Sequence, residues 1–377
     1  SAWTQISNDN DQAGKFFYPR SVDVNKDPAS PFFGRIYVNN PVPGTTSKPP
    51  APQRTLAAKG IFSMFADMTD ALGQGDTPMT GGAAWKAAKY YSPWHVVVGP
   101  DNKVYMFDWA DGHAGVWVAP ADLSGSWVAI LDPQDESITA GDLASDGAAV
   151  PPASHGSVSG GVVVGKGLDR KLYTVDEDIA DPAYPKTSTG SVWMYPIGAA
   201  DARYSKSPSI LWNDGVAGNI VINSQMDIDV DADGNFFVCQ NRSNASDTRP
   251  SVWKIAADGN AANNYAPLWD SKFATDWYNT GGDWLRNNSS GVAVDKFHNR
   301  IASAGGTGKV NVFSTSLAKA SLVQIQNDST TSVNATTDVA FDAAGNLYVS
   351  DNVIQLLRVW SPPDGANEYT TKSAFTF

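Results

Sequence analysis

The stretch DIDVDADGNFFVCQ (227–240) decides the fold, because relatives of it recur along the chain. Clear copies are DVAFDAAGNLYVSD (338–351), HVVVGPDNKVYMFD (95–108) and VVVGKGLDRKLYTVD (162–176), and weaker ones are GVAVDKFHNRIASA (291–304) and SVDVNKDPASPFFGRIYVNN (21–40). Each copy is an alternating apolar segment, a turn rich in Asp, Gly and Asn, and a second alternating apolar segment. This pattern predicts a β-hairpin.

The segment DVDADG (229–234) also has the spacing that opens an EF-hand calcium loop. An EF-hand needs a bidentate Glu at its twelfth position, where this chain has Gln240, and a helix on either side. The aromatic and β-branched residues that follow favour a strand instead. We therefore predict a hairpin turn at Asp231 to Asn235, with a strand returning from Phe236.

A third strand follows each hairpin and is marked by a Val-Trp pair or an equivalent. The marks are GVWVA (Trp117), SVWMY (Trp193), SVWKI (Trp253) and RVWSP (Trp360), and the weaker ones are GIFSM (Phe62) and KVNVF (Phe313). A fourth apolar segment is visible in WVAILD (127–132), SILWND (209–214) and PLWDS (267–271). Six copies of a four-stranded unit predict an all-β fold, a six-bladed β-propeller of four-stranded antiparallel blades. The recurring Trp residues are expected to pack between neighbouring blades.

We expect one propeller domain over residues 1–377. Its blades are expected at about residues 16–92, 93–150, 151–215, 216–275, 276–330 and 331–377. Both ends of the chain, SAWTQI (1–6) and SAFTF (373–377), have the composition of strands. One of them is expected to supply the outer strand of the last blade and so to close the ring. The other is then available to pair with a second subunit.

The frames VAFDAAGNLYVSD and VGPDNKVYMFD resemble those of the NHL and SMP-30/gluconolactonase-like group of six-bladed propellers. The resemblance covers most of the chain as architecture and does not specify a function. For the lactonase members it implies one divalent cation in the central channel, held by Glu, Asn and Asp side chains from different blades. Asn223 and Asp351 stand near the levels of such ligands. A divalent cation such as calcium is the cofactor to expect.

Composition narrows the range of partners. The chain has a net charge of −12 and no dense Lys/Arg patch, which disfavours nucleic acid and anionic membranes. No apolar run has the length of a membrane span. Cys239 is the only cysteine, so the chain forms no internal disulfide. A surface rich in Asn, Asp, Ser and Thr, and a start at Ser1 that a removed signal peptide would explain, favour an extracellular or cell-surface protein.

Propeller geometry sorts the histidines between the two mouths of the channel. Residues just before an innermost strand and just after the second strand share one mouth, and the hairpin turns lie at the other. His95 begins an innermost strand, His113 follows Asp108, and His155 precedes the next innermost strand. These three are therefore expected at one mouth, together with Asp108, and His298 is expected at the other.

His and Asp in one concavity can perform acid/base chemistry or bind a divalent ion, whereas Asp at a strand end can also simply cap backbone N–H groups. Asp227 lies at this mouth as well. The candidate catalytic residues are His95, Asp108 and His155. The candidate ligand-binding residues are Trp94, Trp109, His113, Asp176, Arg20 and Arg242. The candidate metal ligands are Asp108, Asp176, Asp338 and Asp351. Six Asn residues fit the N-glycosylation pattern: Asn241, Asn244, Asn287, Asn288, Asn327 and Asn334.

Two hypotheses of function follow. The first is a secreted or cell-surface propeller that acts as a binding or assembly module, taking a glycan or further copies of itself as partner, with self-association through a terminal strand. The second is an enzyme at the His/Asp mouth, either a metal-dependent, lactonase-like hydrolase or a glycan lyase or hydrolase. The missing catalytic signature favours the first, because the chain contains no G-x-S-x-G nucleophile elbow and no P-loop.

Overall fold

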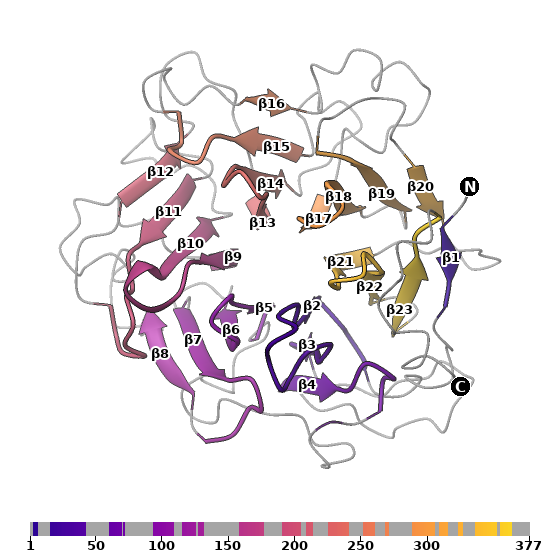
Figure 1. Ribbon diagram of the computed structural model, residues 1–377, viewed down its shortest axis with the longest axis horizontal. Helices are drawn as coiled ribbons and strands as arrows, with labels where there is room; N and C mark the ends of the chain where they lie inside the picture. Colours follow the sequence, from indigo (N-terminus) through magenta and orange to yellow (C-terminus); the bar gives the residue numbers. More distant parts are fainter. Residues whose placement is uncertain are drawn as a thin grey trace.

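The structure is a computed structural model of the chain. It describes residues 3–6, 16–42, 60–69, 71, 93–108, 115–125, 127–131, 158–176, 191–204, 209–213, 225–240, 252–260, 268–270, 289–305, 309–315, 323–326, 336–352 and 355–363. These residues form six antiparallel sheets arranged like blades around a central axis (Figure 1). The predicted six-bladed β-propeller is therefore confirmed. No helix in the described part of the chain is long and apolar enough to cross a membrane.

One strand of each blade lines the axis. These innermost strands are β2 (Ser21–Val24), β5 (His95–Val98), β9 (Val158–Val164), β13 (Gln225–Val230), β17 (Ser289–Asp295) and β21 (Thr336–Phe341). Each contacts the next in this order, and β21 contacts β2, so that the ring is closed. The sequence predicts innermost strands near Val24, Val98, Val164, Val230, Val294 and Phe341, and all six are confirmed.

The remaining strands extend each blade outward. The second strands are β3 (Ile36–Asn40), β6 (Lys103–Asp108), β10 (Lys171–Asp176), β14 (Phe236–Gln240), β18 (Arg300–Gly305) and β22 (Leu347–Asp351). The third strands are β4 (Gly60–Met64), β7 (Gly115–Pro120), β11 (Ser191–Tyr195), β15 (Val252–Ile255), β19 (Lys309–Ser314) and β23 (Leu356–Ser361). The outer strands are β8 (Val128–Leu131), β12 (Ser209–Asn213), β16 (Trp269–Asp270), β20 (Val323–Gln326) and β1 (Thr4–Gln5). A short 3₁₀ helix, η4 (Gly167–Asp169), lies between β9 and β10.

The first blade differs from the predicted four-stranded unit. Its sheet has three strands, β2, β3 and β4, among the described residues. The chain reverses after β4, and the Ala71 N–H donates to the Ser63 carbonyl oxygen at 3.0 Å. The outer edge of β4 is thus already engaged by the chain that follows it.

The N-terminal segment closes the ring. Strand β1 pairs antiparallel with β23, with Thr4 opposite Ser361 and Gln5 opposite Trp360. The Ile6 N–H extends this pairing to the Val359 carbonyl oxygen at 2.8 Å. Of the two strand-like ends, SAWTQI therefore completes the last blade, and SAFTF (373–377) lies outside the described residues.

Six apolar clusters form the core, and each lies between two neighbouring blades. The third-strand Trp residues are buried in them. Trp117 lies between blades 1 and 2, Trp193 between blades 2 and 3, Trp253 between blades 3 and 4, and Trp360 between blades 5 and 6. The predicted packing role of these Trp residues is confirmed.

The DVDADG segment forms a turn, as predicted. The Asp231 carboxylate accepts hydrogen bonds from the backbone N–H groups of Asp233 (3.0 Å) and Asn235 (2.8 Å). Gly234 has φ of +84°, a conformation that favours glycine. Blade 6 repeats the same turn with Asp342, which accepts from the Asn346 N–H at 2.9 Å. The Asp spacing that suggests a calcium loop therefore shapes a hairpin.

Candidate functional site

A shared irregularity places the same residue position of each blade at the channel. The pairing of innermost and second strands shifts by one residue just before Gly160, Asp227, Gly291 and Asp338. Because His95 pairs with Phe107 and Ser21 pairs with Asn39, these two residues take the same position in the remaining blades. We call these six residues, one per blade, the inner ring: Ser21, His95, Gly160, Asp227, Gly291 and Asp338.

Large and small residues alternate around the inner ring. Blades 2, 4 and 6 contribute His95, Asp227 and Asp338, whereas blades 1, 3 and 5 contribute Ser or Gly. A Cβ on Gly291 would lie 2.2 Å from Asp338 Oδ1, and one on Gly160 would lie 2.6 Å from the Met226 carbonyl oxygen and 3.1 Å from Asp227 Oδ1. The small residues thus leave the space that the two carboxylates occupy.

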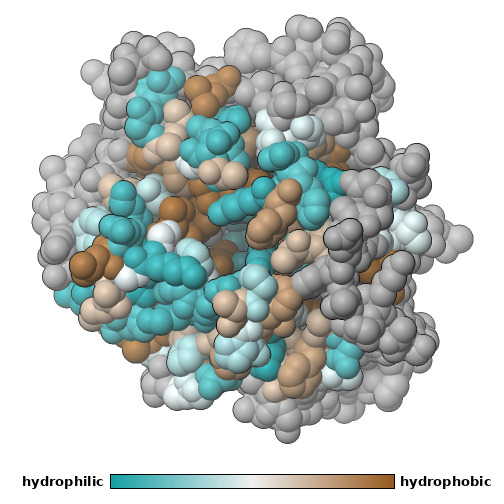
Figure 2. Space-filling view, viewed as in Figure 1, coloured by the Kyte–Doolittle hydropathy of each residue, from teal (hydrophilic) through white to brown (hydrophobic). Residues whose placement is uncertain are grey.

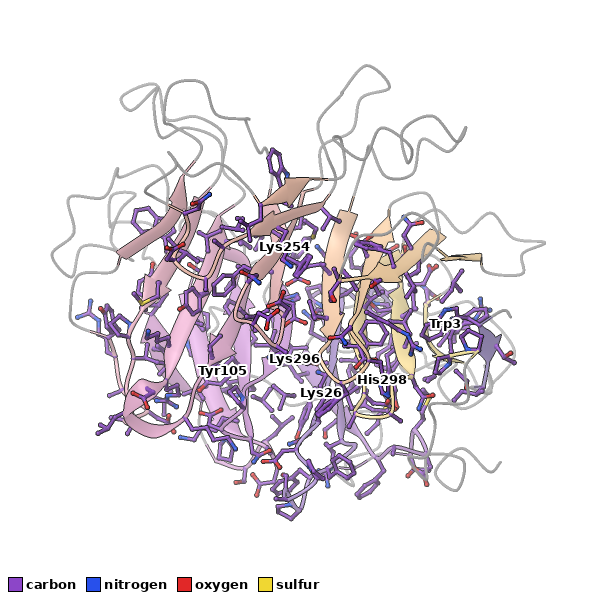
Figure 3. The ribbon with its side chains drawn as sticks, turned by 45° about the horizontal axis from the view of Figure 1, so that its top comes forward. Trp3, Lys26, Tyr105, Lys254, Lys296 and His298 are labelled. Atoms are coloured by element: carbon purple, nitrogen blue, oxygen red, sulfur yellow. The ribbon has the colours of Figure 1, made fainter. Side chains whose placement is uncertain are left out.

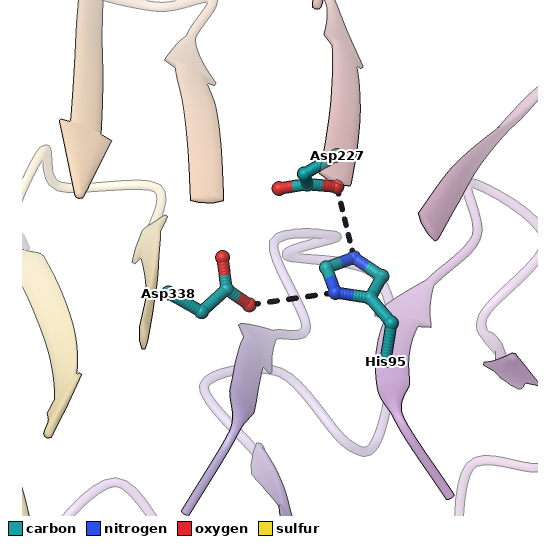
Figure 4. A group of neighbouring side chains, drawn as sticks. All are labelled: His95, Asp227 and Asp338. Atoms are coloured by element: carbon teal, nitrogen blue, oxygen red, sulfur yellow. Dashed lines mark ion pairs between the residues drawn. The ribbon is translucent and has the colours of Figure 1, made fainter. Parts of the chain in front are cut away.

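The three large residues of the inner ring meet on the axis (Figure 4). His95 Nε2 lies 3.0 Å from Asp227 Oδ1, and His95 Nδ1 lies 3.7 Å from Asp338 Oδ2. The relative exposures of His95, Asp227 and Asp338 are 3%, 2% and 1%. Three polar side chains from three different blades are therefore buried against one another.

Backbone N–H groups fix both carboxylates. Asp227 accepts from Ile228 N–H at 2.8 Å and from Val292 N–H of the next blade at 2.9 Å. Asp338 accepts from Val339 N–H at 2.8 Å and from Val22 N–H of the next blade at 3.0 Å. Each Asp thereby joins two blades and holds its remaining lone pairs toward the axis.

Burial and charge oppose each other at this group. Burial lowers the pKa of His95, but the Asp227 and Asp338 carboxylates outweigh it and raise that pKa above 6.5. Burial raises the pKa of Asp338 far above its ordinary value, against the opposing effect of His95. The group therefore favours retaining positive charge, on a proton or on another cation, between its carboxylates.

A cavity of about 440 Å³ leads to the group. Its walls come from all six innermost strands and from the hairpin turns of blades 1, 2, 3, 5 and 6. Since His95, Asp227 and Asp338 stand at or near the starts of their strands, they form one end of the cavity, and the turns form the other. Figure 2 shows the hollow at the centre of the ring, with hydrophilic residues around it.

Arg20 and Trp94, both predicted to bind ligand, contact each other. The Arg20 guanidinium lies 4.3 Å from the Trp94 ring centroid and is 3% exposed. Its Nη1 donates to the Thr337 carbonyl oxygen at 2.6 Å, and its Nη2 donates to the Ser290 carbonyl oxygen at 3.5 Å. These contacts join four blades next to the inner ring.

The other predicted site residues have mixed placements. Asp108 and Asp351 are buried at the ends of β6 and β22 and do not belong to the described His/Asp group. Asp176 ends β10, and its side chain lies outside the described part of the structure. His298 lies in a hairpin turn, at the opposite end of the blades from His95, as predicted. The following lie outside the described residues: Trp109, His113, His155, Asn223, Arg242, Asn241, Asn244, Asn287, Asn288, Asn327 and Asn334. Their predicted roles stay predictions.

Asp227 is the site residue that the sequence-based candidate sets lack. Its position in the sequence predicts the correct mouth of the channel but not its contact with His95. Alignment of the six inner strands by their shared pairing shift brings it level with His95 and Asp338. That shift follows no single residue type in the sequence.

Comparison with known proteins supports the fold alone. No protein-family model matches the chain, and no curated protein matches it. A crystallised protein of unknown function from Bacteroides thetaiotaomicron is 14% identical, with a TM-score of 0.54 over 95% of this chain and 75% of its own. A putative gluconolactonase is 10% identical, with a TM-score of 0.51 over 96% of this chain and 91% of its own. The predicted likeness to the SMP-30/gluconolactonase-like propellers is confirmed as a likeness of fold.

Proposed function

We propose that the protein is a binding propeller. It holds a divalent cation between His95, Asp227 and Asp338 of the inner ring, and it takes a small ligand in the cavity that leads to this group. One observation carries this proposal. His95, Asp227 and Asp338 are buried together, each offering one ligand atom, and these atoms all lie within 4.8 Å of one another. A buried cluster of this kind at the end of a cavity is a candidate binding site.

The donor set indicates which cation fits. One imidazole nitrogen and two carboxylate oxygens suit a transition-type divalent ion such as Zn²⁺ or Mn²⁺. Calcium instead takes six to eight oxygen ligands, which makes it a poorer fit than sequence analysis suggests. Backbone N–H groups that already orient both carboxylates provide the outer hydrogen bonds typical of metal sites.

The competing interpretation needs no metal. A protonated His95 between two carboxylates is a satisfied buried ion group, which would serve only to join blades 2, 4 and 6. On this interpretation the proton of His95 already neutralises the carboxylates, and we expect no measurable binding of Zn²⁺ or Mn²⁺. Metal binding therefore separates the two interpretations.

The test is calorimetric titration of Zn²⁺ and Mn²⁺ into the purified, chelator-treated protein and into two variants. Asp227→Asn removes a proposed ligand. Asp229→Asn is the matched control, because Asp229 caps Val294 N–H at 2.7 Å just as Asp227 caps Val292 N–H, but lies outside the group. We expect one site per chain, weakened roughly tenfold or more by Asp227→Asn. Absence of binding to the wild type, or equal losses in both variants, would overturn the proposal.

A second candidate function is metal-dependent hydrolysis at the same site. It is favoured by the position of the group, which ends a cavity large enough for a small-molecule substrate. A bound cation would supply Lewis-acid polarisation of a carbonyl oxygen. The check is turnover of a panel of lactones and esters by the metal-loaded protein, with Asp227→Asn and Asp229→Asn compared as above. Turnover that survives Asp227→Asn would exclude this site.

A further inference from the structure

Three lysines stand in the hairpin turns of alternate blades. Lys26 and Lys296, in blades 1 and 5, stand five residues beyond the inner-ring residues of their blades, and Lys166, in blade 3, stands six residues beyond its own. The corresponding residues of blades 2, 4 and 6 are Pro100, Ala232 and Ala343. All three lysines line the cavity, at the end opposite the His/Asp group. Lys26 and Lys296 are labelled in Figure 3. We call these three residues the lysine ring.

Lys26 reaches into the channel. Its Nζ lies 2.7 Å from Asp23 Oδ1 and donates to the Val24 carbonyl oxygen at 3.3 Å. An ammonium group has three N–H donors, and these two acceptors use two of them. Burial opposes its charge and lowers its pKa, but the Asp23, Asp229 and Asp342 carboxylates together outweigh burial and raise the pKa of Lys26. Lys26 therefore stays charged and keeps one donor for a ligand.

The other two lysines are held loosely. Lys166 Nζ lies 3.6 Å from Asp27 Oδ2, and its side chain is 62% exposed. An exposed ion pair of this kind adds little to the free energy of folding, so it restrains the Lys166 side chain only weakly. Lys296 is exposed and forms no ion pair among the residues that the structure describes, although its charge lowers the pKa of Asp229 against the larger effect of burial. Both side chains can turn toward a ligand in the mouth.

We propose that the lysine ring binds a small oxyanion, a carboxylate or a phosphate, at the turn-side mouth of the channel. The proposal deepens the proposed function, because it names the ligand class as a small molecule with an anionic group at this end and its remainder toward His95, Asp227 and Asp338. It rests on the proposed function only for the part of the ligand that faces His95, Asp227 and Asp338. The lysine ring itself needs no metal.

The negative charge of the protein opposes the binding of an anion. The net charge of the chain is −12, and Asp23, Asp27, Asp229, Asp295 and Asp342 also line the cavity outside the His/Asp group. An anion is therefore repelled by most of the surface, and measurable anion binding requires a local concentration of positive charge. Lysine supplies such charge to phosphate or carboxylate as a point donor.

The experiment is titration of inorganic phosphate and, separately, acetate at low ionic strength, without and with Mn²⁺. Lys166→Met and Lys296→Met remove exposed members of the lysine ring. Lys171→Met is the control, since Lys171 is also exposed and changes the net charge equally, but does not line the cavity. We expect one anion per chain, weakened roughly two- to fivefold by each lysine-ring variant and unchanged by Lys171→Met. Preference for phosphate or for acetate then identifies the anionic group.

The outcomes separate this inference from the proposed function. Anion binding that depends on Lys166 and Lys296 and persists in Asp227→Asn supports the lysine ring even where no metal binds. No binding of either anion to the wild type, or an equal loss in Lys171→Met, overturns it whatever the metal result. Lys26→Met is informative only where its thermal midpoint matches the wild type, because Lys26 also pairs with Asp23.

Discussion

Replacement of Trp3 by Ala tests how the ring is closed. Trp3 precedes the two-residue strand β1 and is 8% exposed, buried in the cluster between blades 5 and 6. Its ring centroid lies 6.5 Å from that of Phe341, and the Arg300 guanidinium lies 5.6 Å from it. Because β1 pairs through two residues and one further hydrogen bond from Ile6, we expect the buried indole to contribute much of the attachment of this segment.

The expected loss can be worked out. Truncation of a buried Trp to Ala costs about 3–5 kcal/mol. An unfolding entropy of about 2.1 cal/mol/K per residue gives roughly 0.8 kcal/mol/K for the 377 residues of the chain. A loss of about 4 kcal/mol therefore lowers the melting temperature by about 5 °C.

Differential scanning calorimetry measures this shift directly. Phe297→Ala is the control, because Phe297 is also aromatic but is 64% exposed in a hairpin turn, so its loss should leave the midpoint almost unchanged. A Trp3→Ala midpoint within 1 °C of the wild type would refute the role of β1 as the closing strand. So would an equal shift in both variants.

Two further predictions concern the channel. Gly291→Ala places a Cβ 2.2 Å from Asp338 Oδ1 and 2.7 Å from the Asp338 Cα. We therefore expect the free energy of unfolding in denaturant to fall by about 1–3 kcal/mol and Zn²⁺ binding to weaken. Unchanged stability would show that the inner ring accommodates a methyl group at this position. Burial raises the pKa of Asp342 from 3.8 to about 6, so the folded state binds this proton more tightly than the unfolded state. The stabilisation that this proton gives the folded state is complete below about pH 4 and is lost as the pH rises through about 6. The difference in unfolding free energy between the wild type and Asp342→Asn should therefore fall by on the order of 3 kcal/mol from pH 4 to 7. A difference that does not change with pH would contradict this assignment.

The fold could be predicted from the sequence because each blade repeats its own local signals. The turn residues Asp231 and Asp342 accept hydrogen bonds from backbone N–H groups two and four residues ahead. All the residues that define each turn therefore lie within five consecutive positions of the sequence. The third-strand Trp residues mark the contact between neighbouring blades in the same local way. Such signals need no knowledge of the distant parts of the chain.

The site could be predicted only in part. His95 and Asp338 are both sequence-based candidates, and the structure brings them together, but with Asp227 rather than Asp108 or Asp351. Asp351 ends a second strand, whereas Asp338 stands on the innermost strand of the same blade. Contact across the channel depends on strand and level, which a one-residue shift in pairing decides. Alternation of composition does not reveal that shift.

The carboxylates that line the channel join neighbouring blades, and two of them also form part of the proposed cation site. Asp23, Asp227, Asp229 and Asp338 each accept a backbone N–H from the innermost strand of the next blade, at 2.7–3.0 Å. An innermost strand has an unpaired edge toward the axis, and these side chains satisfy it. Only two of the four, Asp227 and Asp338, also face His95.

The proposed cation site therefore uses carboxylates that the fold already requires for joining its blades. Carboxylates that cap strand edges are held rigidly at the axis, and one histidine on blade 2 is enough to turn two of them into a candidate cation site. Blades 1, 3 and 5 leave space at that level and place lysines at the opposite mouth instead. The two ends of the channel thus carry opposite charge preferences, a cation at the inner ring and an anion at the lysine ring, which is the arrangement that would orient a ligand chelating a cation at one end and bearing an oxyanion at the other.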